Sequence, residues 1–383
     1  MRRWPPIALA VVAAAPALGA CGQAPASSPE PAARSDAARA SPAPAAPAGP
    51  RSDRARLSRR ASFGGPISPK SVAASGTGLV FAQNMMYRHS VTVYDARRLR
   101  LKATIADGVR LARLGHPAYP GTTKGAPVEA AFSPDGRSAY VSNYSMYGPG
   151  FGREGSDVCS PASGYDRSFV YRIRLDRLRI DAAYRVGAVP KVVATSRDGR
   201  FVLASNWCSY DLSVISTRRG REVRRVPIGA YPRGIAVSPT KPVAYVAVMG
   251  GGEVVRVDLR DWSTRRLAVG AGPRALSVGP RGRYLYATLN AEGTVARLDL
   301  RSGAVVKART GAAPRSMDIA PDGRSLYVVN YESGTVSKLR TSDMSVVQTI
   351  EACHHPIGIT YEPVTRRVWV ACYTGSVLVL DDR

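Results

Sequence analysis

The chain has 383 residues, 45% of them apolar and 21% charged, so it can bury a core and is not disordered as a whole. Lys and Arg exceed Asp and Glu by 54 − 28 = 26. This balance favours anionic partners and says nothing about the fold. The five Cys residues include no Cys-x-x-Cys pair, so c-type haem attachment and a zinc ribbon have no support.

The N-terminus has the features of a secretory signal. Arg2 and Arg3 precede an apolar stretch over 7–18, which is too short to span a bilayer. Leu18-Gly19-Ala20-Cys21 resembles a bacterial lipobox, which implies cleavage before Cys21 and lipidation of that residue. Ordinary cleavage after Ala20 is the alternative. We therefore expect a signal peptide over 1–20 and a protein anchored by lipid in the bacterial cell envelope, facing the periplasm or the exterior.

The segment after the signal is compositionally biased. Residues 22–50 contain 11 Ala and 7 Pro in 29 positions and show no apolar periodicity. We expect the lipidated Cys and a disordered tether over 21–56, followed by a folded domain over 57–383.

One sequence unit recurs seven times in that domain. Its copies begin at Pro69, Pro127, Pro190, Pro232, Pro273, Pro314 and Pro356. Consecutive copies lie 58, 63, 42, 41, 41 and 42 residues apart, so the two long steps carry insertions of about 16 and 21 residues. Each copy alternates apolar and polar residues with period two and contains a tight-turn signal such as Asp322-Gly323. Four antiparallel strands in each copy predict an all-β, seven-bladed β-propeller.

The last copy ends after its third strand, so its outer strand has to come from elsewhere. We predict that Leu57–Phe63 supplies this strand and closes the ring. Tyr140-Val141-Ser142-Asn143 and the stretch from Tyr327 to Val336 resemble the YVTN-repeat (YncE-like) seven-bladed propellers. The resemblance implies the fold over 57–383 and little about function, because that family includes proteins with no known chemistry.

Cations follow the repeat proline in five of the seven copies: Lys70, Lys191, Arg233, Arg274 and Arg315. Val128 and Ile357 occupy the other two positions. Equivalent positions in a closed repeat lie on a circle, so we expect a ring of positive charge at the channel mouth, on the face that carries both insertions. Such a ring repels itself and attracts an anion. The alternative is that each cation pairs with a carboxylate or carbonyl of the next blade.

Asparagines and aromatic residues follow the second strand of several copies. Asn84, Asn143, Asn206, Asn290 and Asn330 are expected to satisfy turn backbone. Tyr144, Trp207 and Tyr331 beside them either stack a ligand or cap a blade core. Together with the cation ring and with His354 and His355, these three aromatic residues complete the predicted ligand-binding set.

The four remaining cysteines suit an oxidising compartment. Cys353 and Cys372 occupy neighbouring repeat positions of the last blade, and Cys159 and Cys208 lie in corresponding loops of adjacent blades. We predict a disulfide within each pair. A metal site made of Cys353, His354, His355 and Cys372 is the alternative, since thiolate and imidazole suit zinc or copper.

No nucleophile elbow, Walker loop or His-Glu-x-x-His motif is present. His116, Glu129 and Asp318 are the only residues that suggest acid–base chemistry at the mouth. We therefore favour a non-catalytic, monomeric scaffold without a cofactor or metal, which binds an anionic envelope ligand or a partner protein. Extracytoplasmic placement argues against nucleic acid as a partner. The rival functions are a lactonase-like hydrolase or lyase at the channel mouth, and a redox-cofactor carrier or assembly protein.

Overall fold

The computed structural model describes residues 50–86 and 88–383. The predicted signal peptide, the lipobox with Cys21 and the tether as far as residue 49 lie outside the described residues. Within the described part, no helix is long and apolar enough to cross a membrane. The helices there are short 3₁₀ turns: η1 (Ser52–Arg54), η2 (Leu111–Leu114) and η3 (Pro161–Ser163).

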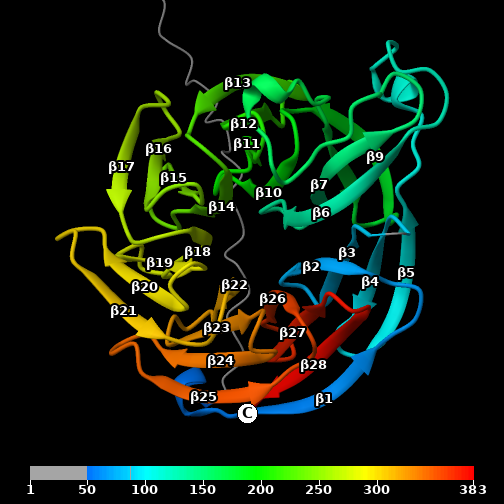
Figure 1. Ribbon diagram of the computed structural model, residues 1–383. Coiled ribbons are helices and arrows are strands. Elements are labelled where there is room, and N and C mark those ends of the chain that lie inside the picture. Colours follow the sequence, from blue (N-terminus) through cyan, green and yellow to red (C-terminus); the bar gives the residue numbers. More distant parts are fainter. Residues whose placement is uncertain (1–49, 87) are drawn as a thin grey trace, which may run out of the picture. The chain divides into compact units, whose positions relative to one another are not determined.

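Seven four-stranded antiparallel sheets make up the rest, which confirms the predicted fold class (Figure 1). Blade one contains β2 (Pro69–Ala74), β3 (Leu79–Asn84), β4 (Ser90–Asp95) and β5 (Arg100–Ala106). Blade two contains β6 (Lys124–Phe132), β7 (Ser138–Tyr147), β8 (Phe169–Arg174) and β9 (Arg179–Arg185). Blade three contains β10 (Pro190–Thr195), β11 (Phe201–Asn206), β12 (Asp211–Ser216) and β13 (Arg221–Pro227). Blade four contains β14 (Pro232–Val237), β15 (Val243–Val248), β16 (Glu253–Asp258) and β17 (Thr264–Ala268).

The remaining blades follow the same order. Blade five contains β18 (Pro273–Val278), β19 (Tyr284–Leu289), β20 (Thr294–Asp299) and β21 (Val305–Arg309). Blade six contains β22 (Pro314–Ile319), β23 (Ser325–Asn330), β24 (Thr335–Arg340) and β25 (Val346–Glu351). Blade seven contains β26 (Pro356–Glu362), β27 (Arg367–Cys372), β28 (Ser376–Asp382) and the N-terminal strand β1 (Leu57–Phe63).

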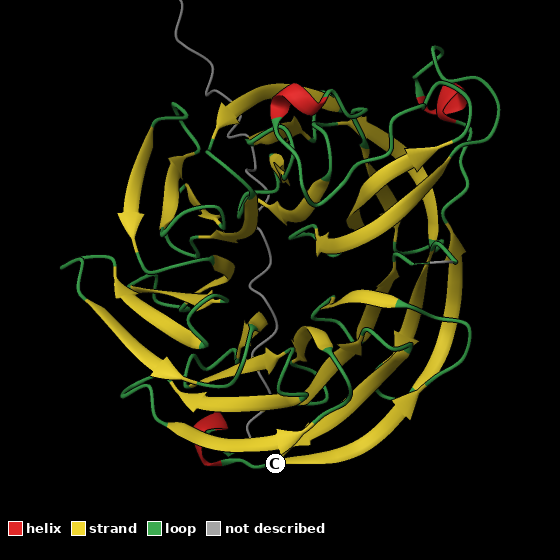
Figure 2. Cartoon of the chain, viewed as in Figure 1, coloured by secondary structure: helices red, strands yellow, loops and turns green. Residues whose placement is uncertain are grey.

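The blades form a closed ring in chain order. The first strand of each blade contacts the first strand of the next, and β26 contacts β2 (Figure 2). Strand β1 pairs with β28 from Leu57 opposite Asp382 to Phe63 opposite Val377, as predicted for the closing strand. Residues just before β1 also pack on the ring, because the Ser52 amide donates to the carboxylate of Asp322 over 2.9 Å.

The hydrophobic core lies between neighbouring blades. Strand β23 is buried along its whole length, whereas most of the outer strand β21 is exposed. Tyr327 and Val329 of β23 pack against blade seven, while Leu326 and Val328 pack on the other side with residues of blade five. Because successive side chains of a strand point to opposite faces, the continuous apolar run Leu326–Val329 buries both faces of this middle strand.

A repeated bulge shapes the channel. In every blade the pairing of the first strand slips just after the repeat proline, where the cation positions lie. A bulge of this kind re-aims a side chain that regular pleating would place on a sheet face. Each blade therefore presents the residue at its cation position in the same way, which is what a ring of like side chains requires.

A backbone clip joins each bulge to the end of the second strand. The residue before the proline has a left-handed backbone in five blades, as at Ala313 with φ 53° and His355 with φ 54°. Its carbonyl accepts a hydrogen bond from the first residue after the second strand, for example from Tyr331 to Ala313 over 3.0 Å. The cation position and the mouth residue are therefore held at a fixed spacing in these blades.

Candidate binding site at the channel mouth

The cation positions surround one channel. Arg233, Arg274 and Arg315, which we call the arginine arc, come from three consecutive blades and line a cavity of about 440 Å³ together with Glu129 and Asp318. Lys70 lines a second cavity of about 470 Å³ with Tyr144, Asp157 and Tyr373, residues of the mouth.

Lys191 is the paired member of the ring. Its ammonium, 4% exposed, donates to Asp157 Oδ1 over 2.6 Å. It also lies 4.2 Å from the centre of the Tyr144 ring and 5.1 Å from that of Trp207. Asp157 belongs to the second insertion, and its carbonyl accepts a hydrogen bond from the Trp207 indole over 2.9 Å. The insertion thus delivers one carboxylate to the cation ring.

The arginine arc lacks such a carboxylate. Arg233 is 6% exposed, and its guanidinium has no hydrogen bond or ion pair with the residues that the structure describes. Arg274 is 8% exposed and donates to the Arg315 carbonyl over 3.1 Å and weakly to the Met249 sulfur. The buried Nε of Arg315 has no partner in the described part of the chain. Buried hydrogen-bond donors in proteins normally have acceptors, so the unpaired guanidinium nitrogens of Arg233 and Arg315 are unusual.

Burial and mutual repulsion lower the pKa values of three cations in the ring. Burial is the largest cause that holds the pKa of Lys70 well below its ordinary value, and the charges of Arg233 and Arg274 add to it. Burial and the charge of Arg233 lower the pKa of Lys191 to about 7, although Asp157 opposes them. Burial, and then Arg233 and Arg315, lower the pKa of Arg274. An anion in this channel would relieve all of these repulsions.

The mouth aromatics hold the cations in place. The Arg315 guanidinium lies 3.4 Å from the centre of the Tyr331 ring, and His355 stacks on Tyr331 with centroids 4.2 Å apart. Trp207 packs against Tyr231 at 4.6 Å. Tyr331 therefore stacks on both Arg315 and His355. A ligand would contact Arg315, which Tyr331 positions, and not the Tyr331 ring itself. His354, the other predicted rim histidine, is exposed.

The rings of His354 and His355 lie 3.8 Å apart, and the left-handed backbone of His355 turns them toward each other. The metal site that the sequence offered as an alternative does not form here, because Cys353 and Cys372 are joined in a disulfide. No group of three or more His, Cys, Asp or Glu side chains suited to a metal ion occurs in the described part of the chain.

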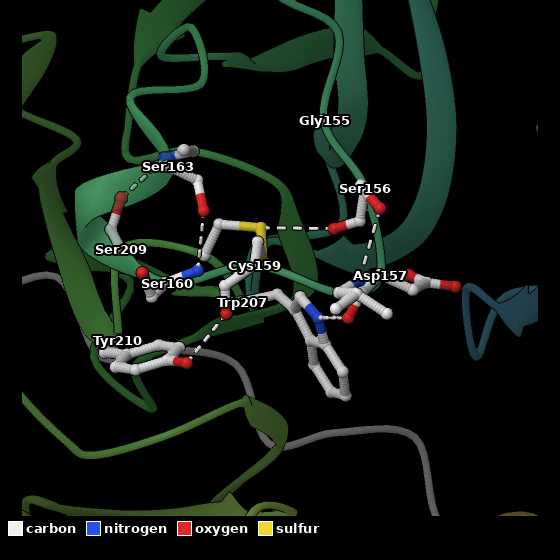
Figure 3. The surroundings of a disulfide bond; sticks show 12 residues. Gly155, Ser156, Asp157, Cys159, Ser160, Ser163, Trp207, Ser209 and Tyr210 are labelled. Atoms are coloured by element: carbon white, nitrogen blue, oxygen red, sulfur yellow. Dashed lines mark hydrogen bonds between the residues drawn. A yellow bond between two sulfur atoms is a disulfide. The ribbon is translucent and has the colours of Figure 1, made fainter.

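Both predicted disulfides are confirmed. The Cys159–Cys208 bond ties the second insertion to blade three, and Figure 3 shows it with Trp207 and Tyr210 nearby. The Tyr210 hydroxyl donates to the Cys159 carbonyl over 2.7 Å, and the Gly155 amide donates to Ser145 over 2.9 Å. These contacts fix Asp157 in front of Lys191. Disulfides are typical of proteins outside the cytoplasm.

The asparagine set needs one correction. Asn84, Asn206 and Asn330 end their strands, whereas Asn143 lies inside β7. The side-chain amide of each donates to a hydroxyl or carbonyl of the next strand, such as Asn330 to Ser337 over 2.9 Å. Asn290 lies one residue later, because Leu289 and not Asn290 pairs with the repeat proline Pro273. Asn290 therefore occupies the mouth position that Tyr331 holds in blade six.

The three weak catalytic candidates are not brought together. Glu129 and Asp318 line the channel cavity, and burial raises the pKa of each carboxyl. Asp318 accepts hydrogen bonds from the Tyr361 amide over 2.8 Å and the Thr360 hydroxyl over 3.1 Å, which links blade six to blade seven. His116 packs on Phe169, and its Nε2 lies 2.8 Å from the Ala183 carbonyl oxygen on blade two.

Two residues at the mouth, Tyr373 and Asp157, were not predicted from the sequence. Tyr373 follows Cys372 as Tyr331 follows Asn330, and its ring lies 5.3 Å from the Lys70 ammonium. Alignment of the repeats would have found it. Asp157 lies in an insertion without a counterpart in the other blades, so the repeat pattern carried no signal for it.

Comparisons with known proteins agree with the architecture. No family model and no curated protein matches the chain. Among solved structures, 1657 chains match, and so many matches point to a widely used fold. One is the hydrazine synthase of Kuenenia stuttgartiensis, with a TM-score of 0.65 and 17% identity over 83% of this chain and 96% of that chain. At this identity the similarity shows a shared β-propeller fold and nothing further.

Proposed function

We propose that the chain is a lipid-anchored scaffold of the bacterial cell envelope, which binds an anionic ligand or partner at the insertion-bearing mouth of its propeller. One observation carries the proposal: three consecutive blades place Arg233, Arg274 and Arg315 around one cavity without a carboxylate bound to any of them in the described residues. A buried cation without a partner is costly, and a negatively charged ligand offsets that cost.

The location rests on two independent features. The lipobox at Leu18–Cys21 supports lipidation at Cys21, and the two disulfides support an oxidising compartment. The likeness of Tyr327–Asn330 to YVTN repeats is consistent with a non-catalytic propeller. The mass of the protein extracted from its own envelope tests this part. We expect an acylated Cys21, and a mature chain without acyl mass would contradict the anchor.

Binding of sulfated polysaccharide to the propeller tests the cationic mouth. We expect binding that weakens with salt and is reduced in R233A/R274A/R315A, since each lost cation removes a contact to the anion. The matched control is R218A/R265A/R309A, which removes the same charge from exposed positions. Equal binding by both triple variants would contradict a role for the mouth.

A further inference from the structure

The arginine arc has the properties of a built oxyanion site. An Arg guanidinium presents five donors in a planar fork that matches the oxygens of phosphate and carboxylate groups. Most of these donors are unused here, since Arg233 has no partner among the described residues and Arg274 uses only Nε and one terminal nitrogen. Arg stays protonated in proteins, so burial does not remove the charge.

Contacts hold two of the three arginines and the backbone beside the third. Tyr331, itself stacked on His355, holds Arg315 from one side. Arg274 is fixed by its bond to the Arg315 carbonyl. Gly234 lets the strand that bears Arg233 approach blade five closely, because an added Cβ there would lie 2.4 Å from the Arg274 carbonyl oxygen. Donors held in place before a ligand arrives lose little freedom when they bind it.

The charges around the channel set the charge of the ligand. Lys191 and Asp157 form a pair and cancel. When Lys70 is protonated, it and the arginine arc contribute four positive charges, and Glu129 and Asp318 contribute two negative ones when ionised, which leaves 4 − 2 = +2. Protonation of either carboxyl would only increase this excess. A ligand with two negative charges neutralises the site, whereas a monoanion does not.

The size of the cavity limits the ligand. A volume of about 440 Å³ suits a small molecule, and small residues such as Ala275, Ser277 and Ser316 form part of its wall. A polymer chain would lie mainly at the mouth, where Tyr144, Asp157 and Tyr373 lie, and would bring only a few of its charged groups to the arc. The interior of the channel therefore favours a compact solute over a polysaccharide or a protein surface.

We propose that Arg233, Arg274 and Arg315 together bind one compact dianionic oxyanion inside the channel, of the class that phosphate monoesters and small dicarboxylates share. This inference rests on the proposed function and makes it specific, since it moves recognition from the mouth to the arc. Phosphate and carboxylate present the same paired oxygens to a guanidinium, so the experiment separates them.

Calorimetric titration at constant ionic strength tests the site, with glycerol phosphate, succinate and nitrate as probes. We expect saturable binding of one equivalent of glycerol phosphate or succinate and none of nitrate. Tighter binding of glycerol phosphate would identify phosphate monoesters as the ligand class, and tighter binding of succinate would identify dicarboxylates. In R233A/R274A/R315A we expect a loss of about tenfold or more, since hydrogen bonds to charged groups are among the stronger ones. R218A/R265A/R309A should bind as the parent does.

A second variant keeps the test informative if the alanine variant misfolds. R233K/R274K/R315K retains the charge but not the forked donors, so we expect weaker binding with an intact fold. Failure of both dianions to bind the parent chain, or equal binding by all variants, overturns the inference. If sulfated polysaccharide still binds through the arc while both dianions fail, the dianion site is wrong and the proposed function stands. If neither class depends on the arc, both are wrong.

Discussion

Two buried groups of charges in this ring differ in what surrounds them. At the closure of the ring, between blade six and the closing blade, the Lys338 ammonium is 0% exposed, forms an ion pair with Asp382 and donates to the Ala55 carbonyl over 2.8 Å. The Tyr327 hydroxyl donates to the same carboxylate over 2.6 Å. In the arginine arc, Arg233 is nearly as buried and has no such partner within the described chain. Burial alone therefore does not separate structural charges from functional ones, whereas the pairing of donors and acceptors does.

The largest loss of stability should come from breaking the ion pair between Lys338 and Asp382. Lys338→Met leaves the Asp382 carboxylate buried without its cation, which should cost about 3–5 kcal/mol of unfolding free energy. Urea unfolding followed by circular dichroism measures it. K338M/D382N removes both charges and should recover most of the loss. If K338M unfolds at the same urea concentration as the parent, the pair has no structural role.

The disulfide at the closure should come next. Cys353 and Cys372 take the place of the Gly311 and Asn330 pair of blade six, where an added Cβ on the glycine would lie 2.7 Å from the asparagine side chain. C353A/C372A should lose about 3 kcal/mol, as expected for a loop of this length. C353G/C372N restores the contact used by blade six and should lose less. Equal losses in urea unfolding would show that the two pairs are not equivalent.

A substitution in the arginine arc should leave the free energy of unfolding unchanged or raise it, in contrast to the two variants above. Arg233→Met removes a buried positive charge that repels Lys70 and Arg274 and that has no hydrogen bond or ion pair with the described residues. Without ligand, we expect unchanged stability or a gain of up to about 1 kcal/mol. The same urea experiment checks this. A loss as large as that of K338M would place Arg233 with the structural charges and remove the distinction between the two regions.

The smallest effect should be the pH dependence of ligand binding that the titration of Lys191 causes. Its pKa is lowered to about 7, so the ring loses one positive charge as the pH rises through that value. Succinate, whose carboxylates stay ionised in this range, should bind more weakly above it. Asp157 raises the pKa of Lys191, so Asp157→Asn should move the midpoint of the binding profile to lower pH. Calorimetry from pH 6 to pH 9 measures both curves, and coincident midpoints would contradict the coupling.

Much of the fold was predictable because it is repeated. Seven proline-led copies with period-two alternation specify the blades, and the missing outer strand of the last copy pointed to Leu57–Phe63. The cysteine pairs followed from equivalent repeat positions. The site was less predictable, because its decisive contacts are not repeated. Asp157 lies in a unique insertion, and the stacking of His355 on Tyr331 depends on a left-handed backbone at His355. Asn290 was misplaced because a one-residue shift leaves its strand pattern almost unchanged.

The pairing of Leu57 with Asp382 also sets an order in time. During synthesis the outer strand of the closing blade emerges first, and the three strands that it completes emerge much later, beginning 299 residues after Leu57 at Pro356. Until then β1 has no partner strand, and the faces of blades one and six that later pack on blade seven expose apolar side chains, and both features are prone to join other chains. A nascent or truncated chain that lacks β28 therefore has no strand on which β1 can pair, and its ring loses the hydrogen-bonded link between the N-terminal and C-terminal segments.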